Sequence, residues 1–217
     1  MRRWLALELA GTIRHDGNGG VADDLSTLAG LSCWIRAEEA LLAPQFAGAG
    51  AQLFFTPDEH ALAAVVAVRT SVRALLARAV APAAPSRADA DRLPKAADAL
   101  EHLNRVAARM PTILSLDWPA DAGQLPSMRF SDTSAVDPVD RLTSILAREA
   151  MLFLADEDRG RLAACSAPRC VRYFLKEHGR QEYCKPSCSN RARAARHYQR
   201  RQESAAPAPE TGAAEQQ

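Results

Sequence analysis

Apolar side chains recur every three or four positions through most of residues 1–155, and this spacing places them on one face of a helix. The pattern predicts a first helix over about 22–43. A second helix should begin at Thr56-Pro57-Asp58-Glu59, where Thr56 and Glu59 form a capping box and Pro57 takes the first helical position. This helix is expected to run until the proline-rich break at 81–85.

The remainder of this region predicts two more helices and a small hairpin. One helix is expected over about 88–109, with Pro94 as a kink or a restart, and the last should begin at Asp137-Pro138. Between them, aliphatic and β-branched residues at 112–117 and 128–130 flank a turn with Gly and Pro, a pattern typical of a hairpin. The predicted fold is therefore mainly α, with one small β-hairpin.

Four cysteines follow this helical region in the spacing C-x4-C-x13-C-x3-C, at Cys165, Cys170, Cys184 and Cys188. Two close pairs separated by a short loop can hold one zinc ion. Because all four ligands are sulfur, we expect one structural Zn²⁺ per chain, whereas a catalytic zinc keeps a position open for water. The fifth cysteine, Cys33, lies among apolar residues and is expected to pack as a small hydrophobe.

Positive charge is concentrated around these four cysteines. Residues 161–201 hold eleven Lys or Arg and two Glu, a net charge of +9, whereas the whole chain is only +1 and the remainder is therefore −8. The stretch after the fourth cysteine lacks Pro and Gly and predicts a helix. Five of its six basic side chains fall within about 140° of arc at roughly 100° per residue. They are Arg193, Arg196, His197, Arg200 and Arg201.

Such a cationic stripe on a small module is typical of a protein that binds a nucleic-acid backbone. We expect Arg193, Arg196 and Arg200 to contact phosphates. We call the segment that holds the four cysteines the zinc knot. The opposite side of the same helix is expected to pack on this knot through Ala194, Ala195 and Tyr198.

The C-terminal stretch resembles the CGNR zinc finger, which typically closes with an aromatic-Cys pair, a Cys-Gly-Asn-Arg step and a basic run. The matching residues are YCKPSCSNR at 183–191, ARHY at 195–198 and Arg200-Arg201. Ser189 stands where the family has Gly, and Tyr183 replaces the usual Trp. A glycine at position 189 would suit a positive φ or a close backbone approach. Serine at this position is therefore expected to affect the geometry of the last turn, while all four zinc ligands are retained.

In bacteria this finger usually follows an N-terminal domain called ABATE. Residues 22–31 and Leu103-Asn104 resemble that domain, though less closely than the C-terminal stretch resembles the finger. The resemblance implies a stress-induced transcriptional regulator. Asn190 is expected to cap or orient the final helix, and Arg191 to make a structural hydrogen bond to the knot. The expected organisation is a helical domain over 1–155, a charged hinge at 156–161, a zinc finger over 162–202 and a disordered tail at 203–217.

Three functions are compatible with these features. The first is a regulator that binds DNA through its zinc finger, while the acidic helical domain senses a small molecule or forms a homodimer. The second is an adaptor whose zinc module binds RNA or an acidic protein surface. The third, an enzyme, would need clustered titratable residues, but His15, His60 and His102 lie far apart. No stretch reaches the 18 uninterrupted apolar residues of a membrane helix, so the chain is not expected to bind a membrane. Because its thiols suit a reducing compartment, it is expected to be cytoplasmic.

Overall fold

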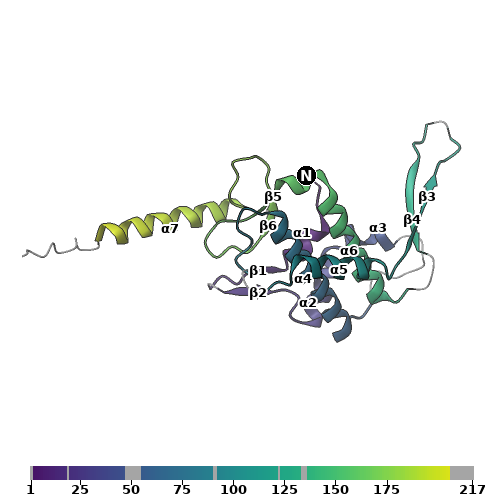
Figure 1. Cartoon of the computed structure of the whole chain (residues 1–217), viewed down its shortest axis with the longest axis horizontal. Helices are drawn as coiled ribbons and strands as arrows, with labels where there is room; N and C mark the ends of the chain where they lie inside the picture. Colours follow the sequence, from purple (N-terminus) through teal and green to yellow (C-terminus); the bar gives the residue numbers. More distant parts are fainter. Residues whose placement is uncertain are drawn as a thin grey trace, which may run out of the picture.

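The computed structural model describes residues 2–18, 20–46, 55–89, 92–121, 123–132 and 136–205. Within these ranges the chain is mainly helical, with seven α-helices, one 3-10 helix and three antiparallel two-stranded hairpins. The helices form a compact body, from which the last helix and the longest hairpin project on opposite sides (Figure 1). The mainly α fold class is confirmed. Of the tail expected to be disordered at 203–217, residues 203–205 belong to the last helix, and the rest lies outside the described residues.

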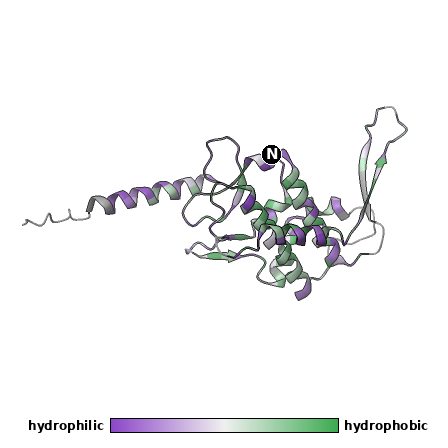
Figure 2. Ribbon diagram, viewed as in Figure 1, coloured by the Kyte–Doolittle hydropathy of each residue, from purple (hydrophilic) through white to green (hydrophobic). Residues whose placement is uncertain are grey.

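Helix α4 (Glu59–Ala79) runs through the centre of the body, where it packs against α1 (Leu5–Ala10), α5 (Ala96–Ala107) and α6 (Pro138–Ala155). It is long and apolar enough to cross a membrane by composition alone, but 56% of its apolar window is buried inside the protein. Figure 2 shows the apolar colouring of these packed helices. Helix α4 is therefore the core helix of the fold.

The predicted starts of α4 and α6 are close to the observed ones. The carboxylate of Asp58 caps α4 by accepting from the backbone N–H of Ala61 at 2.8 Å, so the cap is Asp58 and not Thr56. An extended Asp58 places its carboxylate at the orphan amides of the first turn, as a favourable N-cap residue does. The carboxylate of Asp137 caps α6 in the same way, with Pro138 at its first position.

The single helix predicted over 22–43 is wrong. The chain there forms strand β2 (Val21–Asp23), helix α2 (Leu28–Ala37) and helix α3 (Glu39–Phe46). The hydroxyl of Thr27 accepts from the N–H of Gly30 at 3.0 Å and starts α2. A Cβ at Gly30 would clash with the carbonyl oxygen of Asp24, so this glycine allows α2 to pass directly beside the chain that leaves β2.

The expected burial of Cys33 is also wrong, because its side chain is exposed. Leu31, Trp34 and Ile35 form the buried face of α2. Cys33 lies about 200° from Leu31 around the helix and so faces solvent. The helix predicted over 88–109 begins only at Ala96 in the structure, so Pro94 precedes it and does not kink it.

Two short hairpins lie outside the helical core. Strand β1 (Ile13–His15) pairs with β2, and β3 (Thr112–Asp117) pairs with β4 (Ser127–Asp132) in the register Thr112↔Asp132. The hairpin predicted between the third and last helices is thus confirmed. Several large apolar side chains on or beside β3 and β4 are exposed to solvent. They are Ile113, Leu114, Leu116, Trp118, Leu125 and Met128.

The segment expected as a hinge forms a 3-10 helix, η1 (Glu157–Arg161). The indole N–H of Trp4 donates to the Asp158 carboxylate at 2.9 Å, and the Trp4 ring packs against Phe153 with centroids 5.3 Å apart. Strands β5 (Leu162–Ala164) and β6 (Tyr173–Leu175) follow and pair with each other. Their buried side chains, Leu162, Tyr173 and Leu175, belong to the same apolar core as the helices. The cysteine-bearing region is therefore packed on the helical body.

Candidate metal centre and nucleic-acid interface

Two local structures deliver the four cysteines. Cys165 and Cys170 lie on the loop that joins β5 to β6, and a backbone hydrogen bond from Cys165 N–H to Arg172 O, 2.9 Å long, holds this loop closed. Within the loop, Arg169 has a φ of 65°, a left-handed conformation that reverses the chain just before Cys170. Cys184 precedes helix α7 (Pro186–Ala205), and Cys188 lies in its first turn. The two pairs thus come from a strand loop and a helix start.

The four sulfur atoms lie within 4.8 Å of one another. The sulfur of Cys184 is 3.8 Å from that of Cys170 and 3.6 Å from that of Cys188. These distances exclude disulfides, whose sulfur atoms are about 2.05 Å apart. Four sulfurs placed at about 2.3 Å from a tetrahedral zinc ion would be about 3.8 Å apart. The group formed by Cys165, Cys170, Cys184 and Cys188 therefore fits one structural Zn²⁺, as the spacing predicts.

The electrostatics of the group also favour a cation. Hydrogen bonds from Cys165 and Cys184 lower the pKa of the Cys170 thiol, whereas hydrogen bonding with Cys165 and Cys170 raises the pKa of the Cys184 thiol. The pKa values of neighbouring thiols in the group are thus shifted in opposite directions. A divalent ion would remove this difference, because metal binding displaces the thiol protons. The backbone N–H of Cys184 also points at the sulfur of Cys165 from 3.4 Å, a contact that stabilises a thiolate.

The two departures from the CGNR pattern fit this geometry. Tyr183 packs against the cysteine cluster, beside Phe174, so an aromatic ring still covers the knot. Ser189 lies in the first turns of α7, and among the described non-glycine residues only Arg169 has a positive φ. A serine at 189 therefore adopts helical backbone without the strain that would require glycine.

The two residues expected to be structural lie in the first half of α7. The helix begins at Pro186, so Asn190 is a helical residue and not an N-cap, and its side-chain oxygen accepts from the guanidinium of Arg193 at 2.5 Å. The guanidinium of Arg191 donates to the carbonyl oxygen of Pro168 at 3.1 Å. Pro168 lies on the loop between Cys165 and Cys170, so this bond joins α7 to the other half of the knot.

The packing face predicted for α7 is wrong, because none of its three residues is buried. Cys188 and Ala192 are the buried residues of the helix, whereas Ala194 and Ala195 are exposed and Tyr198 is 65% exposed. The helix has 20 residues and so extends about 30 Å, far beyond a knot that only its first two turns can reach. Figure 1 shows the remainder projecting from the body, and Figure 2 shows its hydrophilic character.

The basic side chains predicted to bind nucleic acid lie on this projecting part. At about 100° per residue, Arg196 and Arg200 continue the same i+4 row as the buried Cys188 and Ala192, and the other members of the stripe lie beside that row. The stripe is exposed because this part of the helix extends past the knot. All five of its members are exposed: Arg193, Arg196, His197, Arg200 and Arg201.

The histidines expected to have no role in metal binding are scattered in the fold. His60 is exposed near the start of α4, and the ring of His102 hydrogen-bonds to the hydroxyl of Ser71 at 2.9 Å. Burial lowers the pKa of His102. Among the described residues, the four cysteines are the one group of His, Cys, Asp and Glu that could hold a metal ion.

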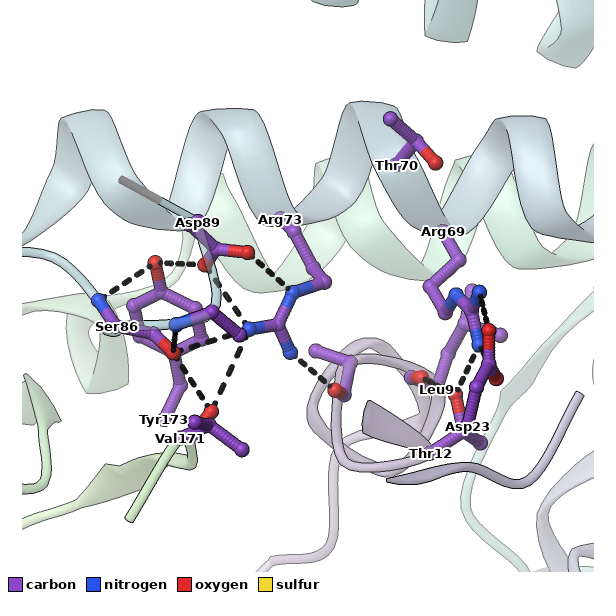
Figure 3. A network of polar contacts seen from close by, with 12 residues as sticks. Leu9, Thr12, Asp23, Arg69, Thr70, Arg73, Ser86, Asp89, Val171 and Tyr173 are labelled. Atoms are coloured by element: carbon purple, nitrogen blue, oxygen red, sulfur yellow. Dashed lines mark hydrogen bonds and ion pairs between the residues drawn. The ribbon is translucent and has the colours of Figure 1, made fainter. Parts of the chain in front are cut away.

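A buried polar cluster, which we call the clamp, joins α4 to the zinc module (Figure 3). Its centre is the ion pair of Arg73 and Asp89, whose side chains are each only 3% exposed and are joined by two hydrogen bonds of 2.8 and 3.0 Å. The hydroxyl of Tyr173, on β6, donates to the same carboxylate at 2.7 Å and accepts from the N–H of Ser86. Burial, with the contact to Asp89, raises the pKa of Tyr173 above its usual range.

The clamp also holds the backbone next to a zinc ligand. The hydroxyl of Ser86 donates to the carbonyl oxygen of Val171 at 2.8 Å, and the guanidinium of Arg73 lies 3.4 Å from the same oxygen. Val171 directly follows Cys170 in the chain. Another N–H of Arg73 donates to the carbonyl oxygen of Ala10, at the end of α1. One guanidinium therefore ties the metal loop to two helices of the body.

The sequence pattern did not predict the clamp. Its partners are separated by as many as 98 residues, so spacing carries no information about them. A signal was present in α4, where Arg69 and Arg73 lie one helical turn apart on the buried side of an apolar helix. Charged residues in such positions require partners, because an unpaired buried charge is costly.

Two family models match the chain. Residues 4–157 match the ABATE family, described as "Putative stress-induced transcription regulator". Residues 161–201 match the CGNR zinc finger. The comparison with curated proteins gives no match. With its helical body, its four-cysteine knot and these two matches, the chain belongs to the ABATE family and carries a CGNR zinc finger.

Proposed function

We propose that this protein is a transcription regulator that binds duplex DNA through α7, held in place by the zinc knot. The observation that supports this best is the exposed part of α7. The helix contains five arginines and one glutamate, and only its first two turns are used for packing. A rigid cationic helix whose basic side chains are exposed suits the phosphate backbone of a nucleic acid.

In this proposal Arg193, Arg196 and Arg200 contact phosphates, with His197 and Arg201 beside them. Phosphate contacts fix the position of a protein on the duplex, while sequence is recognised through base edges. The major groove is wide enough to admit one α-helix, so α7 could reach base edges if it entered the groove. The zinc and Arg191 serve to fix the direction of α7, because both connect its first turns to the loop at Pro168.

The helical body takes a different role in this proposal. Residues 1–155 have a net negative charge, so the body would repel DNA and is proposed to sense a signal or to assemble the protein as a homodimer. The proposal includes no catalysis and places the protein in the cytoplasm with its DNA. Both family descriptions name a regulator or a zinc finger and not an enzyme.

The same arginines support a second candidate, an adaptor that binds RNA or an acidic protein surface. The two candidates differ in how affinity depends on salt. Binding to duplex DNA should weaken with a log-log slope of about −0.9 per phosphate contact, and single strands give about −0.7. Fluorescence polarisation of the full chain with random duplex and with RNA, at two salt concentrations, separates them.

A triple variant tests the contacts themselves. Replacing Arg193, Arg196 and Arg200 by alanine should weaken binding to all duplex sequences alike and reduce the magnitude of the salt slope by about 2.7, because three phosphate contacts are lost. The measurement is the same polarisation titration over a range of salt, with the zinc content checked in both proteins.

The matched control removes three exposed arginines from the body and the 3-10 helix, at Arg36, Arg105 and Arg159. This control changes the net charge by the same amount and should leave the slope unchanged. If the α7 variant kept the affinity and slope of the parent, α7 would not be the binding surface and the adaptor function would replace the DNA-binding function.

A further inference from the structure

We propose that the helical body binds a small organic carboxylate in a pocket beside the clamp. This inference rests on the proposed sensing role of the body and names the class of molecule sensed. The pocket has a volume of about 410 Å³ and lies between the β1–β2 hairpin, the middle of α4 and residues 87–89 and 92–93. Small-molecule pockets commonly have volumes of about 300–1,000 Å³.

The charge of the pocket selects an anion. Among the described residues, four arginines and one carboxylate, that of Asp89, line it. The arginines are Arg69, Arg73, Arg87 and Arg92. Guanidinium groups match the planar, bidentate geometry of a carboxylate, and a concave surface of one sign concentrates the opposite charge.

The inner and outer arginines have different roles. Arg69 is buried and holds the carboxylate of Asp23 through both of its terminal nitrogens, and Arg73 holds Asp89. These contacts lower the pKa of Asp23 despite its partial burial. Both inner pairs are therefore neutralised within the protein.

Arg87 and Arg92 are exposed at the rim, and neither pairs with a carboxylate in the described part of the chain. They are the groups that can bind a ligand carboxylate without breaking the fold. The two buried ion pairs give the pocket a fixed polar floor. Thr70 also lines the pocket, with its hydroxyl donated to the carbonyl oxygen of Val66.

The walls indicate that the anion carries an apolar part. Ile13, Val21 and Leu93 line the pocket together with Ala88, and Val21 is 52% exposed on the hairpin. An apolar group of a ligand would cover Val21 and gain from leaving water. An inorganic anion would use the arginines and leave these walls unused. The combination points to a carboxylate attached to a small hydrocarbon or aromatic group.

The pocket is connected to the metal loop through shared residues. Arg73 and Asp89 line the pocket and also form the centre of the clamp, in which Arg73 and Ser86 hold the carbonyl oxygen of Val171, next to Cys170. A ligand in the pocket would therefore contact the same side chains that position the zinc module. Through these shared side chains, ligand binding in the pocket would affect the position of the zinc module and of α7.

The test is calorimetric titration of the zinc-loaded full chain with benzoate, benzamide and inorganic phosphate. We expect saturable benzoate binding, with benzamide weaker by at least about tenfold because it has the same shape but no charge. Phosphate should also bind more weakly than benzoate, because it cannot use the apolar walls. The double variant Arg87→Gln/Arg92→Gln should weaken benzoate by at least about tenfold without lowering the Tm.

The control is Arg36→Gln, an exposed arginine that does not line the pocket, which should bind benzoate like the parent. Absence of saturable benzoate binding up to millimolar concentrations would overturn the inference. So would equal binding of benzamide, tighter binding of phosphate than of benzoate, or an unchanged affinity in the double variant. The titration contains no DNA, so its failure and a failure of the DNA-binding proposal are separate results.

Discussion

Replacing Cys184 by serine should reduce the zinc content from one ion per chain to well below one and should unfold the region around the knot. The thiolate of Cys184 has two sulfur neighbours at 3.6 and 3.8 Å, so it occupies a central place in the group. Metal binding supplies most of the folding energy of small zinc knots, about 10–16 kcal/mol in zinc-finger peptides at neutral pH. Elemental analysis and amide hydrogen exchange of residues 161–201 measure the two effects.

Cys33→Ser is the matched control for this experiment. Cys33 is exposed on α2 and does not belong to the metal group, so its loss should leave one zinc per chain and unchanged exchange around the knot. A Cys184→Ser protein that still held one zinc would contradict the assigned ligand set. The assignment would also fail if the reduced parent protein contained well under one zinc per chain.

Replacing Arg73 by methionine should destabilise the whole chain by about 3–5 kcal/mol, because the carboxylate of Asp89 would remain buried without its cation. In a protein of this size each kcal/mol lowers the Tm by about 2–4 °C, so a fall of roughly 6–20 °C is expected. The same substitution releases the carbonyl oxygens of Val171 and Ala10 from the guanidinium. A chelator should therefore remove zinc faster from this variant than from the parent.

Arg78→Met provides the control, since Arg78 is exposed in the last turn of the same helix. Thermal or urea unfolding of both variants, followed by circular dichroism, gives the comparison. Similar stabilities for the two variants would show that the Arg73–Asp89 pair does not hold the body and the zinc module together.

The sequence predicted correctly those helices, strands and sites that depend on interactions between residues close together in the chain. The capped start of α6, the apolar period of α4 and the hairpin at 112–132 each depend on neighbouring residues. The cysteine spacing predicted the metal group for the same reason, because each pair of ligands lies within one short turn. The helical period of about 3.6 residues alone also predicts which side of α7 carries the arginines.

Other features depend on contacts between distant residues. The helix predicted over 22–43 begins only at Leu28 because Asp23 lies in a strand and pairs with Arg69, 46 positions along the chain. The clamp joins Asp89 to Tyr173 over 84 positions. The apolar side of α7 looked like a packing face, yet its later turns are exposed because the knot is shorter than the helix. The helical period predicts which side of α7 is apolar, but it does not predict how far along the helix the zinc knot extends.

The claim that α7 carries the DNA contact is tested most directly by comparing two shortened chains. A chain that ends at Gln202 keeps the basic stripe, whereas one that ends at Ala192 keeps all four cysteines and the buried residues of α7 but loses the stripe. Both are titrated with random-sequence duplex at low salt by fluorescence polarisation, after each is shown to hold one zinc per chain. The longer chain should bind like the full protein, and the shorter should bind at least about 100-fold more weakly. Equal affinities of the two chains would contradict the claim.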